Sequence, residues 1–438
     1  MHTVSTDIIF PGVKLTCINT DKFKTGCLTV NFICKLDRAT ASSAALLPHV
    51  LRRGSAEHPD MQSIASALDE LYGARVEPIV RKKGELQCIG FYTDFPDDRY
   101  IPREGEHPRD TGILEETASL LGGLLLSPDL HDGLLRTDYI EGEKSNLIDD
   151  IRAGINDKRG YSIDRLLEEM CADEPFGVSK LGSEEEAQKI TPETLTEYYR
   201  DLISTAPVEA FYCGTAEPTR VADALREAFS GFPERIVTEA PNTGVALYPA
   251  GDSPRRFTEE LDVTQGKLTV GYRLGKAMDN PDYPAMMVFN AVFGGCVTSK
   301  LFLNVRERLS LCYYAGSILE RQKGVMLVAS GVDFANFETA LDEITAQLEN
   351  IKRGDVSDWE LTSAKRAVIT SIRLAMDRPG GLEDLFFDSS VSAVPYDPDE
   401  LCDGVGAVTL DGVIELASDI MLDSVYCLTG KGGDESEA

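Results

Sequence analysis

The feature that most constrains the fold of this chain is an internal repeat. Three segments of the first half match three segments of the second half, and they occur in the same order. The matched pairs are 26–32 (GCLTVNF) with 266–272 (GKLTVGY), 190–203 with 408–421, and 211–215 (FYCGT) with 425–429 (VYCLT). The first and last pairs have the composition of β-strands, and the middle pair opens on a hydroxyl residue placed to cap an amphipathic helix. A chain built this way is expected to fold into two related lobes.

We predict an N-terminal lobe at 1–235, a linker at 236–255 and a C-terminal lobe at 256–438. The linker is assigned because the chain from Gly231 to Arg256 is rich in proline and glycine. Strand-like and helical patterns follow one another in both lobes, so the predicted class is α+β. Each lobe of this tandem duplication is expected to hold a mixed, mostly antiparallel sheet packed with helices. The helices are predicted at 61–72, 112–125, 132–155, 191–204, 283–293, 299–309, 337–353 and 357–376.

The charge of the chain excludes several classes of partner. With 73 acidic and 43 basic residues, the formal net charge is −30, which repels nucleic-acid phosphates and anionic lipid surfaces. No stretch approaches the roughly 18 apolar residues of a membrane span, and the first residues lack the basic and apolar regions of a signal peptide. The ten cysteines form no CxxC pair. We therefore expect a cytoplasmic protein with reduced thiols and with no nucleic-acid or membrane partner.

Candidate catalytic residues are few. All five histidines, at positions 2, 49, 58, 107 and 131, lie in the first third of the chain, which restricts imidazole chemistry to the first lobe. Neither a GxSxG nucleophile elbow nor a P-loop is present. The informative segment is 44–55, AALLPHVLRRGS, which precedes an amphipathic helical run.

That segment resembles the zinc-binding segment of the pitrilysin, insulinase and mitochondrial processing peptidase family. The family carries an inverted zinc motif, HxxEH, in which two histidines at helical spacing hold zinc and the glutamate activates water. Aligned on Gly54-Ser55, this chain has Ala45 at the first histidine and Pro48 at the glutamate, and it retains only His49. A proline inside a helix lacks the amide hydrogen, so we expect the helix to kink or to begin later.

The resemblance also locates the family's third zinc ligand, a glutamate on a later helix that follows a supporting glutamate by seven residues. The run 143–150 matches that stretch, with Glu143 in the supporting position and Asp150 in the ligand position. One histidine and one short carboxylate are too few for a zinc site of this type, which needs three protein ligands and an open position. The resemblance therefore implies no intact catalytic residue and no metal in this chain, with zinc only in a partner chain.

The second lobe keeps the other signature of the family. Segments 293–295 (FGG), 299–302 (SKLF) and 305–314 (VRERLSLCYY) match it. In active relatives the arginine and tyrosine of this signature hold the substrate backbone, which gives Arg306 and Tyr313 a candidate role in binding peptide. The alternative is structural, with Arg306 in an ion pair on a helix surface and Tyr313 at the start of a strand.

Two further segments, 157–162 (DKRGYS) and 168–171 (EEMC), resemble the inactive bacterial YmfF-type branch of the family. Members of that branch are paired with a zinc-bearing sister and associated with elongation factor P modification. The leading hypothesis is therefore a noncatalytic subunit of an insulinase-type zinc metallopeptidase. It would bind peptide or unfolded protein and pair with a catalytic sister chain that carries HxxEH. One alternative is a peptidase with a rearranged metal site around His49, Asp150 and His58, and another is a structural scaffold.

Overall fold

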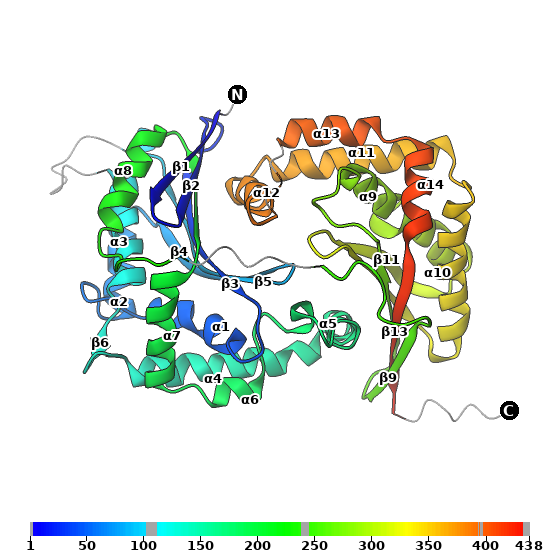
Figure 1. The fold of residues 1–438 in the computed structure, drawn as a ribbon, viewed down its shortest axis with the longest axis horizontal. Helices are drawn as coiled ribbons and strands as arrows, with labels where there is room; N and C mark the ends of the chain where they lie inside the picture. Colours follow the sequence, from blue (N-terminus) through cyan, green and yellow to red (C-terminus); the bar gives the residue numbers. More distant parts are fainter. Residues whose placement is uncertain (1–2, 102–111, 238–244, 393, 395–396, 432–438) are drawn as a thin grey trace. The chain divides into compact units, whose positions relative to one another are not determined.

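The computed structural model describes residues 3–101, 112–237, 245–392, 394 and 397–431. The chain forms two compact units, and neither is a continuous stretch of sequence (Figure 1). Unit 1 comprises 1–152, 178–242 and 376–387, and unit 2 comprises 153–177, 243–375 and 388–438. Of the linker predicted at 236–255, residues 238–244 lie outside the described residues. Each half of the sequence thus supplies a short segment to the other unit.

Unit 1 is built on a six-stranded mixed sheet with the strand order β1-β2-β8-β3-β5-β4. Strands β2 and β8 run parallel, and the other neighbours are antiparallel. The strands are β1 Thr3–Phe10, β2 Val13–Asn19, β3 Thr25–Lys35, β4 Arg75–Lys83, β5 Leu86–Pro96 and β8 Val208–Gly214. The central strands β3 and β8 are buried along most of their length, as expected where both faces of a sheet are covered.

Unit 2 is built on a five-stranded mixed sheet with the order β11-β12-β10-β13-β9, in which β13 and β9 form the parallel pair. The strands are β9 Arg255–Leu261, β10 Gly266–Arg273, β11 Cys312–Glu320, β12 Val325–Val332 and β13 Met421–Gly430. From the parallel pair outward, β2-β8-β3-β5-β4 of unit 1 matches β9-β13-β10-β12-β11 of unit 2. The strands matched in sequence, β3 with β10 and β8 with β13, occupy equivalent places. The predicted α+β duplication is confirmed.

Helices pack on the sheet of unit 1 around one large apolar core. They are α1 Ala41–Leu51, α2 Met61–Glu70, α3 Ile113–Leu126, α4 Thr137–Ala153, α6 Glu184–Gln188, α7 Pro192–Thr205 and α8 Pro218–Ala228. Helices α1 and α3 contact β5, and α8 contacts β1 and β2. Local sequence fixes two of the helix starts, because α2 and α7 begin at the capping boxes of Asp60 with Ser63 and of Thr191 with Thr194.

The helix predicted from residue 132 begins later, at Thr137. Asp132 and Gly133 adopt positive φ angles of 53° and 79° and turn a short hairpin between Leu130–His131 and Leu134–Leu135. A left-handed Asp-Gly pair is a hairpin signal, and here it overrides the helical pattern that surrounds it.

The helices of unit 2 are α5 Lys158–Met170, α9 Tyr283–Asn290, α10 Phe337–Lys352, α11 Asp358–Ala375, α13 Pro398–Ala407 and α14 Leu410–Asp419. Helices α9, α10 and α11 confirm three predicted helices to within a few residues at each end. Across the described residues of both units, no helix combines the length and apolarity needed to cross a bilayer.

The segment 376–387 places the start of α12 (Pro379–Val391) on the sheet of unit 1. Its anchor is Glu383, which is 1% exposed and accepts hydrogen bonds from Arg81 at 2.7 Å and from Thr29 at 3.2 Å. The neighbouring Asp384 pairs with Lys83 at 2.6 Å. Because removal of one partner of a buried ion pair is costly, these contacts fix α12 on β4 and β3.

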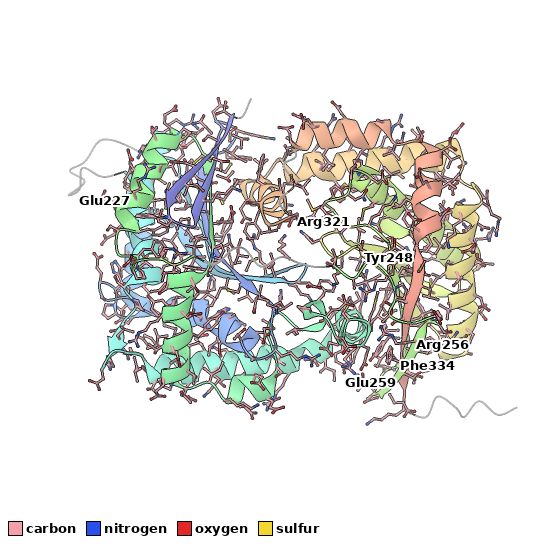
Figure 2. All side chains as sticks on the ribbon, viewed as in Figure 1. Glu227, Tyr248, Arg256, Glu259, Arg321 and Phe334 are labelled. Carbon is pink, nitrogen blue, oxygen red and sulfur yellow. The ribbon has the colours of Figure 1, made fainter. Side chains whose placement is uncertain are left out.

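The converse segment, 153–177, lays α5 on β10 and β13 of unit 2. Glu259 on β9, labelled in Figure 2, accepts hydrogen bonds from the hydroxyls of Tyr161 at 2.6 Å and Tyr426 at 2.7 Å. Ser162 accepts a hydrogen bond from the hydroxyl of the buried Thr269 on β10 at 3.0 Å. These hydroxyl contacts tie α5 to β9 and β10, and the bond from Tyr426 joins β13 to the same carboxylate of Glu259.

A buried charge network completes the attachment of this segment. Arg273, only 2% exposed, contacts Asp423 at 2.9 Å and Glu174 at 2.6 Å, and the ammonium of the fully buried Lys323 also bonds to Glu174. Burial alone would raise the pKa of Glu174, but the hydrogen bonds from Arg273 and Lys323 outweigh it and hold the pKa below its ordinary value. The pKa of Asp423 is lowered against burial in the same way, by Arg255, Ser424 and Arg273.

Glu174→Gln is expected to destabilise unit 2 by about 3 kcal/mol at pH 7, because it leaves Lys323 and Arg273 buried without full compensation. A carboxyl whose folded-state pKa is depressed adds stability above its unfolded pKa and loses it as the pH falls. The difference between wild type and variant should therefore shrink below about pH 4. Urea unfolding followed by the fluorescence of Trp359, the single tryptophan of the chain, measures it in unit 2.

Glu349→Gln is the matched control, since Glu349 forms a partly exposed ion pair with Lys352 on the surface of α10 at 3.0 Å. This variant should change the free energy of unfolding little at pH 7 and at pH 3.5. An equal cost of Glu174→Gln at pH 7 and pH 3.5 would contradict the assignment of the network.

Candidate functional site

Helix α1 carries the positions at which the family motif would stand. It runs without a break from Ala41 to Leu51 and contains Pro48, so it neither begins after the proline nor stops at it. The expectation of a later start is wrong. Ala45 and Pro48 are both buried, and the apolar packing of this side of α1 compensates for the missing amide donor of the proline.

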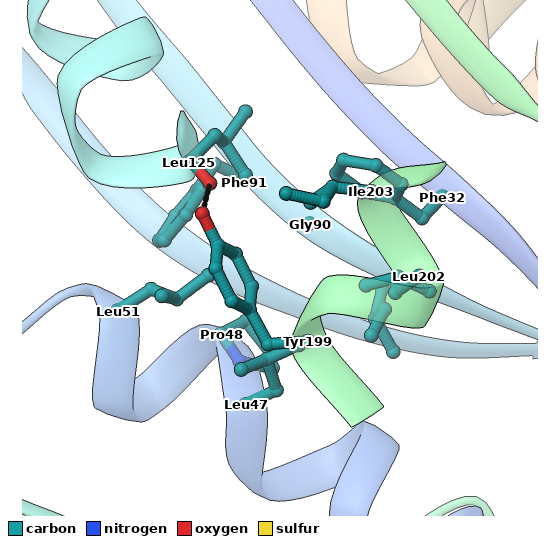
Figure 3. Close-up of a pocket in the computed structure, with 11 residues that line it drawn as sticks. Phe32, Leu47, Pro48, Leu51, Gly90, Phe91, Leu125, Tyr199, Leu202 and Ile203 are labelled. Atoms are coloured by element: carbon teal, nitrogen blue, oxygen red, sulfur yellow. Dashed lines mark hydrogen bonds between the residues drawn. The ribbon is translucent and has the colours of Figure 1, made fainter. Parts of the chain in front are cut away.

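Pro48 lines a small apolar cavity under the sheet of unit 1 (Figure 3). The cavity has room for no more than about one water molecule. Its walls come from β3, β5, α1, α3 and α7: Phe32, Leu47, Pro48, Leu51, Ile89, Gly90, Phe91, Leu125, Tyr199, Leu202 and Ile203. The hydroxyl of Tyr199 is already used, because it donates to the carbonyl of Leu125 at 2.9 Å (Figure 3). No side chain of this wall offers a metal ligand or a general base.

The other vestigial positions point elsewhere. His49 is exposed, whereas its neighbours along α1 are buried. Glu143 on α4 forms an ion pair with Arg53 at 3.4 Å and accepts a hydrogen bond from Asn146 at 3.1 Å. Asp150, farther along α4, is exposed. The guanidinium of Arg53, which follows α1, thus neutralises the carboxylate that would support a metal ligand. Sequence reasoning missed this pairing, although the two arginines before Gly54 were its signal.

The residues therefore do not fit the zinc ion that the family motif would hold. Across the described part of the chain, no three side chains of histidine, cysteine, aspartate or glutamate gather where they could share one metal ion. That holds for the rearranged set of His49, His58 and Asp150 too. His58 lines a different hollow, between α2, α3 and α8.

The second-lobe signature lies on unit 2 in two π-helical turns and the strand that follows them. The turns are Ala291–Gly295 and Leu301–Arg308, and π-helical turns occur frequently at functional sites. Arg306 lies in the second turn, with its guanidinium carbon 4.8 Å from the centre of the Phe302 ring and its Nε 3.5 Å from Glu307. Its side chain is 41% exposed. The expected ion pair is present, but it is a long one and leaves the guanidinium accessible.

Tyr313 is the extra residue of a β-bulge at the start of β11. Cys312 pairs with Val332 and Tyr314 with Gly331, so no residue of β12 is left to oppose Tyr313. Ser310, just before the strand, has a positive φ of 52°. Bulges turn a side chain away from its regular direction, and Tyr313 is 64% exposed. The phenol is thus presented to solvent by a specific backbone arrangement at the edge of the sheet.

Comparison with known proteins agrees with this geometry. Residues 189–368 match the family model described as the peptidase M16 inactive domain. The chain is 33% identical over 425 residues to a Bacillus subtilis protein named "Probable inactive metalloprotease YmfF", covering 96% of this chain and 97% of that one. The chain belongs to the M16 peptidase family. Its resemblance to the inactive YmfF-type branch is confirmed.

Solved structures of M16-like proteins share the fold. A conserved protein from Enterococcus faecalis V583 superposes with a TM-score of 0.88 at 26% identity, covering 98% of this chain and 99% of that one. A peptidase M16 inactive domain from Pseudomonas fluorescens superposes with a TM-score of 0.79 at 14% identity, with 98% of each chain covered, which shows the fold alone. With its motif replaced by Ala45 and Pro48, this chain is an inactive M16 homologue.

The Pro48 cavity predicts how the chain responds if the family's glutamate is restored. Pro48→Glu should lower the free energy of unfolding by roughly 3 kcal/mol or more relative to Pro48→Ala, because it places a carboxylate in an apolar wall without a partner. Alanine and glutamate are both good helix formers, so the comparison isolates the burial of charge. Urea denaturation of the two variants checks this, and equal stability would mean that position 48 can reach solvent or a polar partner.

Proposed function

We propose that this chain is a noncatalytic subunit of an M16 zinc metallopeptidase, pairing with a catalytic sister chain that carries HxxEH and binding peptide or unfolded protein for it. The observation that carries the proposal is an asymmetry between the two signatures. At the positions matched to the zinc site, Pro48 lies in an apolar wall and Glu143 is paired with Arg53, so no ligand set remains among the described residues. The second signature keeps its arginine and its tyrosine, and both Arg306 and Tyr313 are exposed. Both side chains are therefore accessible to a peptide that would lie along this part of unit 2.

The chemistry of the second signature suits an extended peptide. A guanidinium offers several donors to backbone carbonyls, and a phenol both donates and accepts. Both belong to the region where β11 starts, and β11 is an edge strand of its sheet. An edge strand can pair with the backbone of an extended ligand, which gives affinity without sequence preference. Such a subunit contributes binding energy and positioning while its partner performs the chemistry.

The rearranged metal site around His49, His58 and Asp150 is not proposed, because the described residues do not bring these side chains together. We place the assembly in the cytoplasm, where the ten cysteines of this chain, all free, would stay reduced. Any zinc of the assembly would be held by the sister chain.

The direct test is to mix the chain with a separately purified M16 chain of the same organism that carries an intact HxxEH. Peptidase activity should rise as this chain is added and should level off at a one-to-one molar ratio of the two chains. The reason is that the catalytic residues of one chain and the peptide-binding residues of the other would combine in one assembly. Absence of both a complex and a gain in activity would end the proposal.

Substitutions at the second signature test peptide binding within that complex. Arg306→Ala should weaken peptide binding about tenfold or more and Tyr313→Phe by about fivefold, as expected for lost hydrogen bonds to a charged and a neutral donor. Arg353→Ala, at an exposed arginine of the same unit that bonds to Asn350, changes the charge equally and should be silent. If both signature variants bind peptide like wild type, the chain acts as a scaffold instead.

A further inference from the structure

The segment DKRGYS at 157–162 belongs to the first half of the sequence, yet it begins the helix that lies on the sheet of unit 2. The side chain of Asp157 caps α5 by accepting from the amide of Arg159 at 3.1 Å. A side chain at Gly160 would put its Cβ 2.6 Å from the carboxylate of Asp157, so glycine leaves room for the cap. Tyr161 and Ser162 anchor the helix to Glu259 and Thr269. The remaining feature is the side chain of Arg159.

The guanidinium of Arg159 lies over the ring of Tyr314, with its carbon 4.7 Å from the ring centre. Arg159 is exposed. In the described part of the chain it forms no ion pair, so the aromatic ring is its defined contact. A cation over the face of a tyrosine ring is attracted by the ring quadrupole. Arg159 therefore makes a cation–π contact with Tyr314 instead of an ion pair with an acidic side chain.

The Tyr314 ring also lies close to the sheet itself. A Cβ at Gly331 on β12 would lie 2.7 Å from the ring, which means that the ring rests directly on the backbone there. The hydroxyl oxygen of Tyr314 is buried and finds no hydrogen-bond partner among the residues that the structure describes. The ring of Tyr314, which contacts Gly331 and Arg159, therefore makes the defined contacts of this side chain, and its hydroxyl does not.

Tyr314 is one of the two residues that bracket the bulge at Tyr313. Cys312, on the other side, is 7% exposed and paired with Val332. Tyr314 pairs with Gly331, so the bulge lies between this pair and the pair of Cys312 with Val332. A bulge changes the direction of the side chain of its extra residue, which here is Tyr313. The contacts of the Tyr314 ring with Gly331 and Arg159 form a clamp on the residue that directly follows Tyr313.

We propose that Arg159 is a positioning residue for peptide binding: its contact with Tyr314 holds the bulge that presents Tyr313. This inference rests on the proposed function in that Tyr313 is taken to bind peptide. It also gives the DKRGYS segment one purpose, because cap, clearance and anchors all serve to place Arg159 over the ring. The proposed peptide-binding site is thus built from both halves of the sequence, because Arg159 of the first half positions Tyr313 of the second.

The experiment measures binding of a fluorescein-labelled unfolded peptide by anisotropy, with the full chain alone and in complex with the HxxEH-bearing sister. Arg159→Ala should weaken binding roughly two- to fivefold, the range of an exposed cation–π contact. Arg159→Lys should restore part of the loss, and Arg353→Ala should bind like wild type. In the Arg159→Ala background, Tyr313→Phe should cost less than in wild type, because the two residues act in series. Additive losses would indicate a general structural role and overturn the proposal.

A second readout does not depend on peptide. With 3-fluorotyrosine incorporated, the ¹⁹F resonance of Tyr313, identified by its loss in Tyr313→Phe, should shift or broaden in Arg159→Ala and stay unchanged in Arg353→Ala. If the wild-type chain binds peptide, and Arg159→Ala changes neither the Tyr313 resonance nor the affinity, the role of Arg159 is refuted while the proposed function stands. A changed resonance in a chain that binds no peptide, alone or in complex, would refute the proposed function and leave only the clamp geometry.

Discussion

Each of the two sheets depends on a segment from the other half of the sequence, held by buried polar contacts. Glu383 fixes α12 on unit 1 through Arg81, and the network of Arg273, Lys323 and Glu174 fixes the chain after α5 on unit 2. A sheet buries apolar residues on both faces only if both are covered. Each compact unit therefore includes a segment from both halves of the sequence.

The same exchange bears on function. Because α5 travels with the first half but packs on the second sheet, it brings Arg159 to Tyr314. Helix α1, where the resemblance places the zinc motif, holds Ala45 and Pro48 in buried positions. Pro48 is tolerated in α1 because the surrounding side chains are apolar. The fold therefore accommodates an apolar residue at a position where the family motif has a glutamate.

Much of the fold could be predicted from the sequence, and the failures have physical causes. The repeat gave two lobes and the equivalent strands, because alternation and caps are local signals. The path of α5 and α12 could not be seen, since contacts such as Thr29 with Glu383 join residues far apart in sequence. Of the two expectations for Pro48, a kinked helix or a later start, the later start was wrong because tertiary packing overrode local preference. The Asp132-Gly133 turn was a local signal that the helical pattern around it obscured.

The absence of the zinc-motif residues could be predicted from the sequence, but the contacts that occupy those positions could not. Ala45 and Pro48 predicted the missing ligand and base. Only the structure shows that Pro48 lies in an apolar wall and that Arg53 forms an ion pair with Glu143. The account is tested most directly by the zinc content of the chain itself, purified alone, supplied with zinc and dialysed before mass spectrometry of the metal. It predicts no more retained zinc than in a His49→Ala variant. One equivalent of zinc per chain that His49→Ala abolishes would contradict it.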